Sequence, residues 1–161
     1  MKAVSSELSD LFYNTLLCEF TTIGRNGPVT TPMQHAWIAE RGIFVLSSAL
    51  GVRFKLDRLQ HNRKVSLSFT EFTGSGLGTP DAVLVQGTAE VTKKASGVAG
   101  LEDFWASNLR KKPDQRTAAF DVGLREDDRR LFYLRARIEV VPERVFVLRG
   151  DAGAQEIEEV A

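Results

Sequence analysis

The feature that most constrains this sequence is an alternation of apolar and polar side chains with a period of two. It is clear in the stretch VSLSF that begins at Val65, and it recurs along most of the chain. This period is typical of half-buried strands, and the Asn26-Gly27 pair favours a hairpin turn. Two or three short stretches have helical spacing, but no strand-helix-strand rhythm runs through the chain. The pattern therefore predicts a mainly β fold with added helices, and an antiparallel barrel rather than a parallel sheet.

The length of 161 residues suits one domain with a buried core. Ser5 or Ser6 is expected to cap the first helix, and Pro142 to separate the last two strands. We expect residues 1–149 to form the domain and the small, acidic residues 150–161 to form a flexible tail. The spacing predicts helices around 8–16, 52–61 and 101–109, and strands over 18–23, 28–39, 43–46, 64–71, 82–92, 131–141 and 145–149.

Composition excludes several classes of site. Lys and Arg together number 21, as do Asp and Glu, so the basic excess of a nucleic-acid-binding protein is absent. Cys18 is the single cysteine, and we interpret it as a small buried side chain. His35 and His61 lack metal-ligand spacing, so no metal site is expected. No apolar run approaches the roughly 18 residues of a membrane helix, and no signal peptide is evident. We expect a cytoplasmic protein that contacts neither membrane nor nucleic acid.

Several short motifs, in this order and spacing, resemble the flavin-binding split β-barrel proteins of the pyridoxamine 5'-phosphate oxidase-like superfamily, which includes deazaflavin-dependent reductases. The resemblance extends from about residue 8 to residue 149. It implies an antiparallel split β-barrel that binds flavin mononucleotide (FMN). The motifs are TPM at 31–33, IFVLSS at 43–48, RFK at 53–55, VSLS at 65–68, VQGTAEV at 85–91 and RIEVVPERV at 137–145.

The resemblance implies that the strand-to-helix junction after residue 46 holds the cofactor phosphate. A phosphate of charge near −2 needs cations and hydrogen-bond donors when it is partly buried, and a helix start favours an anion. Arg58 adds charge one turn further on, although the family often has Asn there. A solvated helix face is the alternative interpretation of these cations. The implied cofactor-binding residues are Ser47, Ser48, Arg53 and Lys55 for the phosphate, Thr31, Pro32, Met33 and Gln34 for the ring, and Gln86 from a neighbouring strand.

The function implied by the resemblance is an oxidoreductase that uses FMN, or alternatively a deazaflavin coenzyme, on a small conjugated substrate. Hydride chemistry would belong to the cofactor, and no Ser/His/Asp set, carboxylate pair or cysteine nucleophile is found, so no catalytic residue is assigned. Oxidation of pyridoxamine phosphate itself is not expected, because no histidine follows His61. Two alternatives stay open: a flavin-binding or sequestering protein without turnover, and an interaction module without cofactor.

The resemblance also implies a homodimer that buries the cofactor between its subunits, with Trp37 or Trp105 in the contact. Other features are interpreted as structural. His35 is expected to be packed or on the surface, and residues 74–78 to form a flexible loop. The run 110–112 (RKK) is expected to be an exposed helix end, where cations suit the helix dipole.

Overall fold

The computed structural model describes residues 4–78, 80–95, 98–113, 134–150 and 156–161. Its elements follow the predicted order, with strands longer than predicted at several ends. Ser5 caps the first helix, since its Oγ accepts a hydrogen bond from the backbone N–H of Leu8 at 3.3 Å. The elements are α1 (Ser6–Asn14), β1 (Leu17–Gly24), β2 (Gly27–Ile38), β3 (Ile43–Ala49), α2 (Phe54–His61), β4 (Lys64–Phe69), β5 (Ala82–Ala95), α3 (Glu102–Lys111), β6 (Arg135–Arg149) and β7 (Glu156–Glu159).

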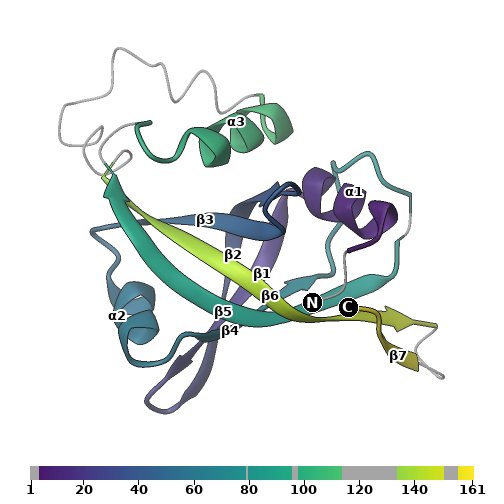
Figure 1. Cartoon of the computed structure of the whole chain (residues 1–161), viewed down its shortest axis with the longest axis horizontal. Coiled ribbons are helices and arrows are strands. Elements are labelled where there is room, and N and C mark those ends of the chain that lie inside the picture. Colours follow the sequence, from purple (N-terminus) through teal and green to yellow (C-terminus); the bar gives the residue numbers. More distant parts are fainter. Residues whose placement is uncertain (1–3, 79, 96–97, 114–133, 151–155) are drawn as a thin grey trace.

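Six strands close into an antiparallel barrel (Figure 1). The strand order is β3-β2-β1-β4-β5-β6, and pairing between β3 and β6, from Phe44↔Val140 to Ala49↔Arg135, completes the ring. β7 pairs with the far end of β6, outside the ring. Closure leaves these six strands without a free edge along their paired lengths. The predicted fold class, a mainly β split barrel with added helices, is confirmed.

Aromatic side chains fill the barrel interior. Phe12 on α1 enters between Phe44 and Phe69, with ring centroids 4.9 Å from each, and it meets the edge of Trp37 at 5.3 Å. Phe12, Phe44 and Phe69 are fully buried. Aromatic pairs at these separations stabilise a core beyond their area burial. The opening helix is therefore part of the core rather than an appendage, as its apolar spacing predicted.

Cys18 lies in the same interior, on β1. Its side chain is 1% exposed, and its Sγ donates to the backbone carbonyl of Met33 at 3.6 Å. Burial, assisted by the neighbouring Glu19 charge, raises the pKa of this thiol far above its ordinary value. The interpretation of Cys18 as a buried side chain is confirmed.

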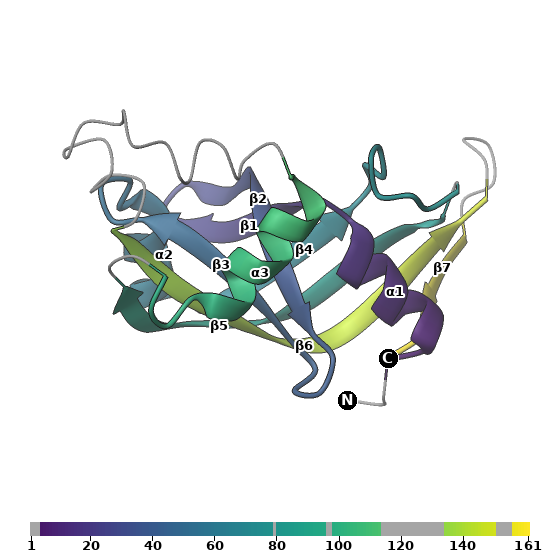
Figure 2. The ribbon, with the colours of Figure 1, turned by 90° about the horizontal axis from the view of Figure 1, so that it is seen from above.

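The three described helices occupy different parts of the barrel surface. α1 and α2 lie toward opposite ends of the long axis in both views (Figures 1 and 2). α3 lies across the outer face of β2 and β3. There it buries Leu101 and Phe104 against Ala36, Ile43 and Val45 in a second, smaller apolar cluster. No helix in the described part of the chain is long and apolar enough to cross a membrane.

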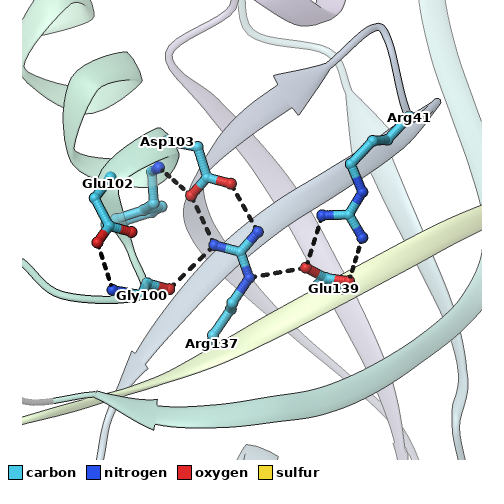
Figure 3. A network of polar contacts seen from close by, with 7 residues as sticks. Arg41, Gly100, Glu102, Asp103, Arg137 and Glu139 are labelled. Carbon is cyan, nitrogen blue, oxygen red and sulfur yellow. Dashed lines mark hydrogen bonds and ion pairs between the residues drawn. The ribbon is translucent and has the colours of Figure 1, made fainter.

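A network of charged side chains fixes the start of α3 to the barrel (Figure 3). The guanidinium of Arg137 on β6 donates two bonds of 2.7 Å to the carboxylate of Asp103 and one of 2.8 Å to Glu139. Arg41 binds the outer side of Glu139. Burial raises the pKa of Asp103, but the hydrogen bonds from Arg137 outweigh it and hold that pKa below its usual value. The two carboxylates are therefore ionised at neutral pH, and both are satisfied.

β6 is one strand, whereas two strands separated by Pro142 were predicted. Pro142 lies opposite Gly87, at a shift in the β5·β6 register. A proline has no N–H to donate, and an irregularity in the ladder accommodates it without ending the strand. At this point the Val141 carbonyl approaches β5 so closely that a Cβ on Gly87 would lie 2.3 Å from its oxygen. The bulge thus requires glycine at position 87.

The predicted flexible tail is wrong for its last residues. Glu156–Glu159 form β7, and the N–H of Val160 donates to the carbonyl of Val145 at 2.8 Å. Val160 and Ala161 pack against the main core. The glutamates are on the exposed strand, and the carboxylate of Glu159 binds Arg144. Acidic composition suggested a frayed end, but the carboxylates here pair with arginines of β6. Residues 151–155 lie outside the described residues.

Candidate functional site

The barrel opens where β2 and β3 separate. Their ladder runs from Ile38↔Ile43 to His35↔Leu46 and ends there. Beyond that pair, β2 continues toward Gly27 with β1 as its partner, while β3 continues to Ala49 with β6 as its partner. Met33 and Ser48 each lie two residues past the last shared pair. The sequence-predicted residues of β2 and β3 therefore flank the split between the two strands.

α2 follows β3 and brings a cation to this split. The Nζ of Lys55 lies 3.0 Å from the Sδ of Met33, a weak acceptor, and the Lys55 side chain is half-buried. Burial lowers the pKa of the Lys55 ammonium, and the nearby charges of Arg58 and Arg135 lower it further. In the part of the chain that the structure describes, no carboxylate pairs with Lys55. An ammonium in such surroundings favours an anionic ligand.

The two serines at the end of β3 face opposite sides of the strand. Ser47 lies on the outer face, where its Oγ accepts a hydrogen bond of 2.6 Å from Arg135 Nε. Ser48 is 3% exposed, and its Oγ has no hydrogen-bond partner among the described residues. A buried hydroxyl without a partner is uncommon and costs free energy. Ser48 therefore offers an unused donor on the β3 side of the split, and Lys55 contacts Met33 on the β2 side.

Arg135, which the sequence analysis missed, belongs to this group of cations. It lies at the start of β6 opposite Ala49, and its guanidinium is 5.9 Å from the centre of the Trp105 ring. Burial lowers the pKa of Arg135. Position 135 fell within a predicted strand, but its proximity to Ser47 depends on the β3–β6 closure, which no local pattern reveals. Arg58, the other cation near Lys55, donates to the Oγ1 of Thr22 at 2.7 Å.

Other predicted residues are distributed less tightly. Thr31 is half-buried on β2 and Pro32 is exposed, while Arg53 precedes α2 on the surface. Gln34 points to the outer face of β2, where its Oε1 accepts a hydrogen bond of 2.7 Å from Asn108 of α3. Within one subunit, the structure thus joins Lys55 to Met33 on the β2 side of the split, places Ser47 and Ser48 on its β3 side, and places Gln34 next to α3.

Gln86 lies elsewhere in the subunit. It is exposed on β5, paired with Ser66, and it lines a 410 Å³ hollow on the outer face of β1, β4 and β5 with Thr21 and Lys64. Thr21 in this hollow is hydrogen-bonded to Thr30 of β2 at 2.8 Å, so the hollow lies beside the part of β2 that pairs with β1. Neither Ser48 nor Lys55 lines this hollow.

His35 is packed inside the barrel, which is one of the two placements predicted for it. Its Nε2 lies 2.9 Å from the carbonyl oxygen of Phe12, so Nε2 carries the proton. Burial lowers the pKa of His35 well below its ordinary value, and the charge of Lys111 lowers it further. The ring is therefore neutral at physiological pH and serves the core.

The end of α3 differs from the prediction of an exposed RKK run. Lys111 extends under the helix, and its Nζ donates to the carbonyl oxygen of His35 at 3.0 Å. Burial, followed by the charge of Arg110, lowers the pKa of Lys111 to about 7. Arg110 stacks on the Tyr13 ring at 3.8 Å and binds the end of α1. Arg110, which is exposed as predicted, thus caps the C-terminal end of α1 and joins it to α3, while Lys111 joins α3 to β2.

The site is therefore a cationic one with hydroxyl donors. Among the described residues, no group of three or more His, Cys, Asp or Glu side chains is placed to hold a metal ion. The cations and hydroxyls come from β3, α2 and β6, and the pairing of β3 with β6 fixes two of these three elements relative to each other. Such an arrangement can bind a phosphate or a similar anion.

Comparisons with known proteins support the fold. Neither a family model nor a curated protein matches the chain. Among solved structures, it is similar to a Clostridium acetobutylicum protein related to general stress protein 26 of the pyridoxinephosphate oxidase family, with a TM-score of 0.58 and 18% identity over 96% of this chain and 92% of that one. An F420 reductase gives 0.58 and 19% identity over 88% and 98%.

A FAD-binding protein from Mesorhizobium loti is a third similar structure. Its TM-score is 0.57, with 18% identity over 88% of this chain and 90% of that one. These identities are too low to carry residue roles from one protein to another, but the similarity extends over nearly the whole length of each pair. The chain accordingly has the split β-barrel fold shared by these pyridoxinephosphate oxidase-family, flavin-binding and F420-reducing proteins.

Proposed function

We propose that the chain binds a phosphorylated flavin-type cofactor, FMN or alternatively a deazaflavin coenzyme, with the phosphate at the split between β2 and β3. The observation that carries this proposal is the pairing of two unsatisfied groups there. Lys55 is a half-buried cation whose near neighbour is a thioether, and Ser48 is a buried hydroxyl without a partner among the described residues. A phosphate oxygen satisfies both.

Each side chain at the split has a separate part in this binding. Lys55 supplies charge from α2, and Ser48 donates a hydrogen bond from β3. Arg58 and Arg135 add positive potential to the same region, and after burial they are the next causes that lower the pKa of Lys55. The ring then lies along β2 beside Thr31, Pro32 and Met33. Arg53 is exposed ahead of α2, and its proposed part is to bind the outer portion of a longer phosphorylated tail.

The proposed activity is that of an oxidoreductase acting on a small conjugated substrate. A bound flavin supplies hydride transfer, and the protein supplies phosphate anchoring, ring orientation and protection from water. The F420 reductase and the FAD-binding protein with this fold support cofactor binding of this kind. The second candidate is a flavin-sequestering protein. Bound flavin that no nicotinamide or deazaflavin donor reduces would favour that alternative.

We further propose a homodimer. Phe54 and Val52 flank the cations at the start of α2 and are 76% and 52% exposed. Exposed apolar side chains grouped in this way favour contact with another protein surface. Trp37 or Trp105 was expected in the contact, and both are buried within the subunit. The proposed contact therefore rests on the Val52–Phe54 surface.

The dimer proposal predicts twice the subunit mass in solution at micromolar concentration, measured by sedimentation velocity. Phe54→Asp places a charge in the proposed contact and should shift the population to monomer. Tyr13→Asp, at another exposed aromatic, should leave the mass unchanged. A monomeric wild-type protein would exclude the dimer.

The cofactor proposal predicts that replacing Lys55 with methionine weakens FMN binding about 10- to 100-fold. Loss of a hydrogen bond to a charged group corresponds to about 1.5–3 kcal/mol. FMN fluorescence quenching in titrations measures the dissociation constant directly. Lys64→Met is the matched control, because Lys64 is exposed and bound to Glu143 on the far face. Equal affinities for wild type and Lys55→Met would remove the phosphate from this helix.

The affinity for FMN should also depend on pH through Lys55. The anion binds the charged ammonium, so affinity is retained below the pKa of Lys55 in the free protein and falls as pH rises through it. Because burial, Arg58 and Arg135 lower that pKa, the loss should begin below the range of an ordinary lysine, whose pKa is about 10.4. Titrations of wild type and Lys55→Met between about pH 7.5 and 9.5 separate this effect from titration of the ligand. Parallel pH profiles for the two proteins would contradict the assignment.

A further inference from the structure

A second cavity lies at the other end of the β5·β6 ladder. It has a volume of 560 Å³, which is within the range of small-molecule sites. Its apolar wall comes from Leu8 and Leu11 on the buried face of α1 and from Val83 and Val147, which pair across β5 and β6. Ligand sites are common in the mouths of β-barrels, and this cavity lies where β5 begins and β6 ends.

The cavity is remote from the proposed phosphate site. Arg135 begins the β6 strand beside Ser47, and Val147 lies 12 residues further along the same strand. At about 3.3 Å per residue, the two positions are separated by roughly 40 Å of strand. A molecule in the cavity therefore makes no contact with Ser48 or Lys55, and the two sites can be tested independently.

The charges at the rim define the class of ligand. Arg149 is the cation that lines the cavity, and it is already paired with Asp81 at 3.5 Å and with Glu158 at 3.0 Å. Glu7, in the first turn of α1, also lines the cavity and has no ion-pair partner among the described residues. The rim thus carries an unpaired carboxylate above an apolar wall. An apolar molecule with a cationic end matches both features.

We propose that this cavity binds a small organic cation, an alkyl or aryl ammonium whose apolar part contacts Leu8, Leu11, Val83 and Val147 and whose ammonium lies by Glu7. The proposal is independent of the cofactor. It follows from the cavity, its apolar wall and the charge at its rim.

Three probes of equal chain length test the class of ligand: hexylammonium, 1-hexanol and hexanoate, each titrated into the full chain by calorimetry. The expected order of affinity is hexylammonium, then 1-hexanol, then hexanoate. Glu7→Gln should weaken hexylammonium binding about threefold, the effect of one ion pair to an exposed carboxylate, and leave 1-hexanol binding unchanged. Asp10→Asn, on the same helix and exposed, is the charge-matched control and should alter neither.

A variant that occupies the cavity tests its location. Gly78 lines the cavity, and a Cβ built there meets no atom within 4 Å. Gly78→Leu should therefore fold with an unchanged melting temperature and lose hexylammonium binding at least tenfold. Lys55→Met should bind hexylammonium as wild type does, whatever happens to FMN. Hexanoate binding as tightly as hexylammonium, an unchanged affinity in Gly78→Leu, or no binding at millimolar probe would overturn the proposal.

Discussion

Gly87→Ala is expected to lower the free energy of unfolding by about 3 kcal/mol, as for a strongly overpacked site. The new Cβ would lie 2.3 Å from the carbonyl oxygen of Val141 and 3.2 Å from the Cα of Pro142. Both are backbone atoms, so no rotamer change relieves the contact, and β5 and β6 must move apart at their bulge. Urea denaturation followed by tryptophan fluorescence measures the loss.

Gly78→Ala is the matched control for this substitution. A Cβ at position 78 meets nothing within 4 Å, and the backbone there is not in the left-handed region. Its effect on the free energy of unfolding should stay within about 0.5 kcal/mol. If the two alanine variants were equally stable, the close approach of Val141 to β5 would be incorrect.

Arg137→Met should lower the free energy of unfolding by about 3–5 kcal/mol, the range for removing one partner of a buried ion pair. The Arg137 side chain is 11% exposed, and it leaves behind two carboxylates that it now satisfies, Asp103 and Glu139. Asp103 lies at the start of α3, so the loss of stability should be concentrated in this helix. Hydrogen exchange in α3 should accelerate more than exchange in β4 and β5, and urea denaturation gives the total.

Arg41→Met provides the comparison within the same network. Arg41 binds Glu139 from the solvent side, and its side chain is 55% exposed. Exposed ion pairs contribute about 0–1 kcal/mol, so this variant should be nearly as stable as wild type. If Arg41→Met and Arg137→Met lowered the free energy of unfolding by comparable amounts, burial would not determine how much each ion pair contributes to stability.

Most of the fold could be predicted from the sequence because the signals are local. Ser5 caps α1 as its position suggested, and the alternation in β4 corresponds to its buried and exposed faces. The exceptions depend on contacts between distant segments. Pro142 remains within a strand because of its bulge opposite Gly87, and the acidic end of the chain pairs with arginines of β6. No local pattern encodes either arrangement.

The candidate site likewise has residues that local signals predict and partners that come from distant segments. Ser48 and Lys55 are seven residues apart, and the strand-to-helix junction between them was predictable. Arg135 reaches Ser47 across the closure of the barrel, 88 residues away in sequence. Asn108, which donates a hydrogen bond to Gln34, lies on α3, and the sequence did not predict against which strands α3 packs. Long-range partners were therefore missed, even where the residues themselves had been placed in the correct element.

The burial of Cys18 gives this protein a chemical reporter of barrel opening. Alkylating reagents react with the thiolate, and burial suppresses both ionisation of this thiol and access to it. Because the chain has one cysteine, every labelled molecule must have exposed the start of β1, where Cys18 lies. When reclosing is faster than labelling, the ratio of the native rate to that of the unfolded chain gives the free energy of this opening. Mass spectrometry of the intact chain would thus follow the opening of β1 under native conditions.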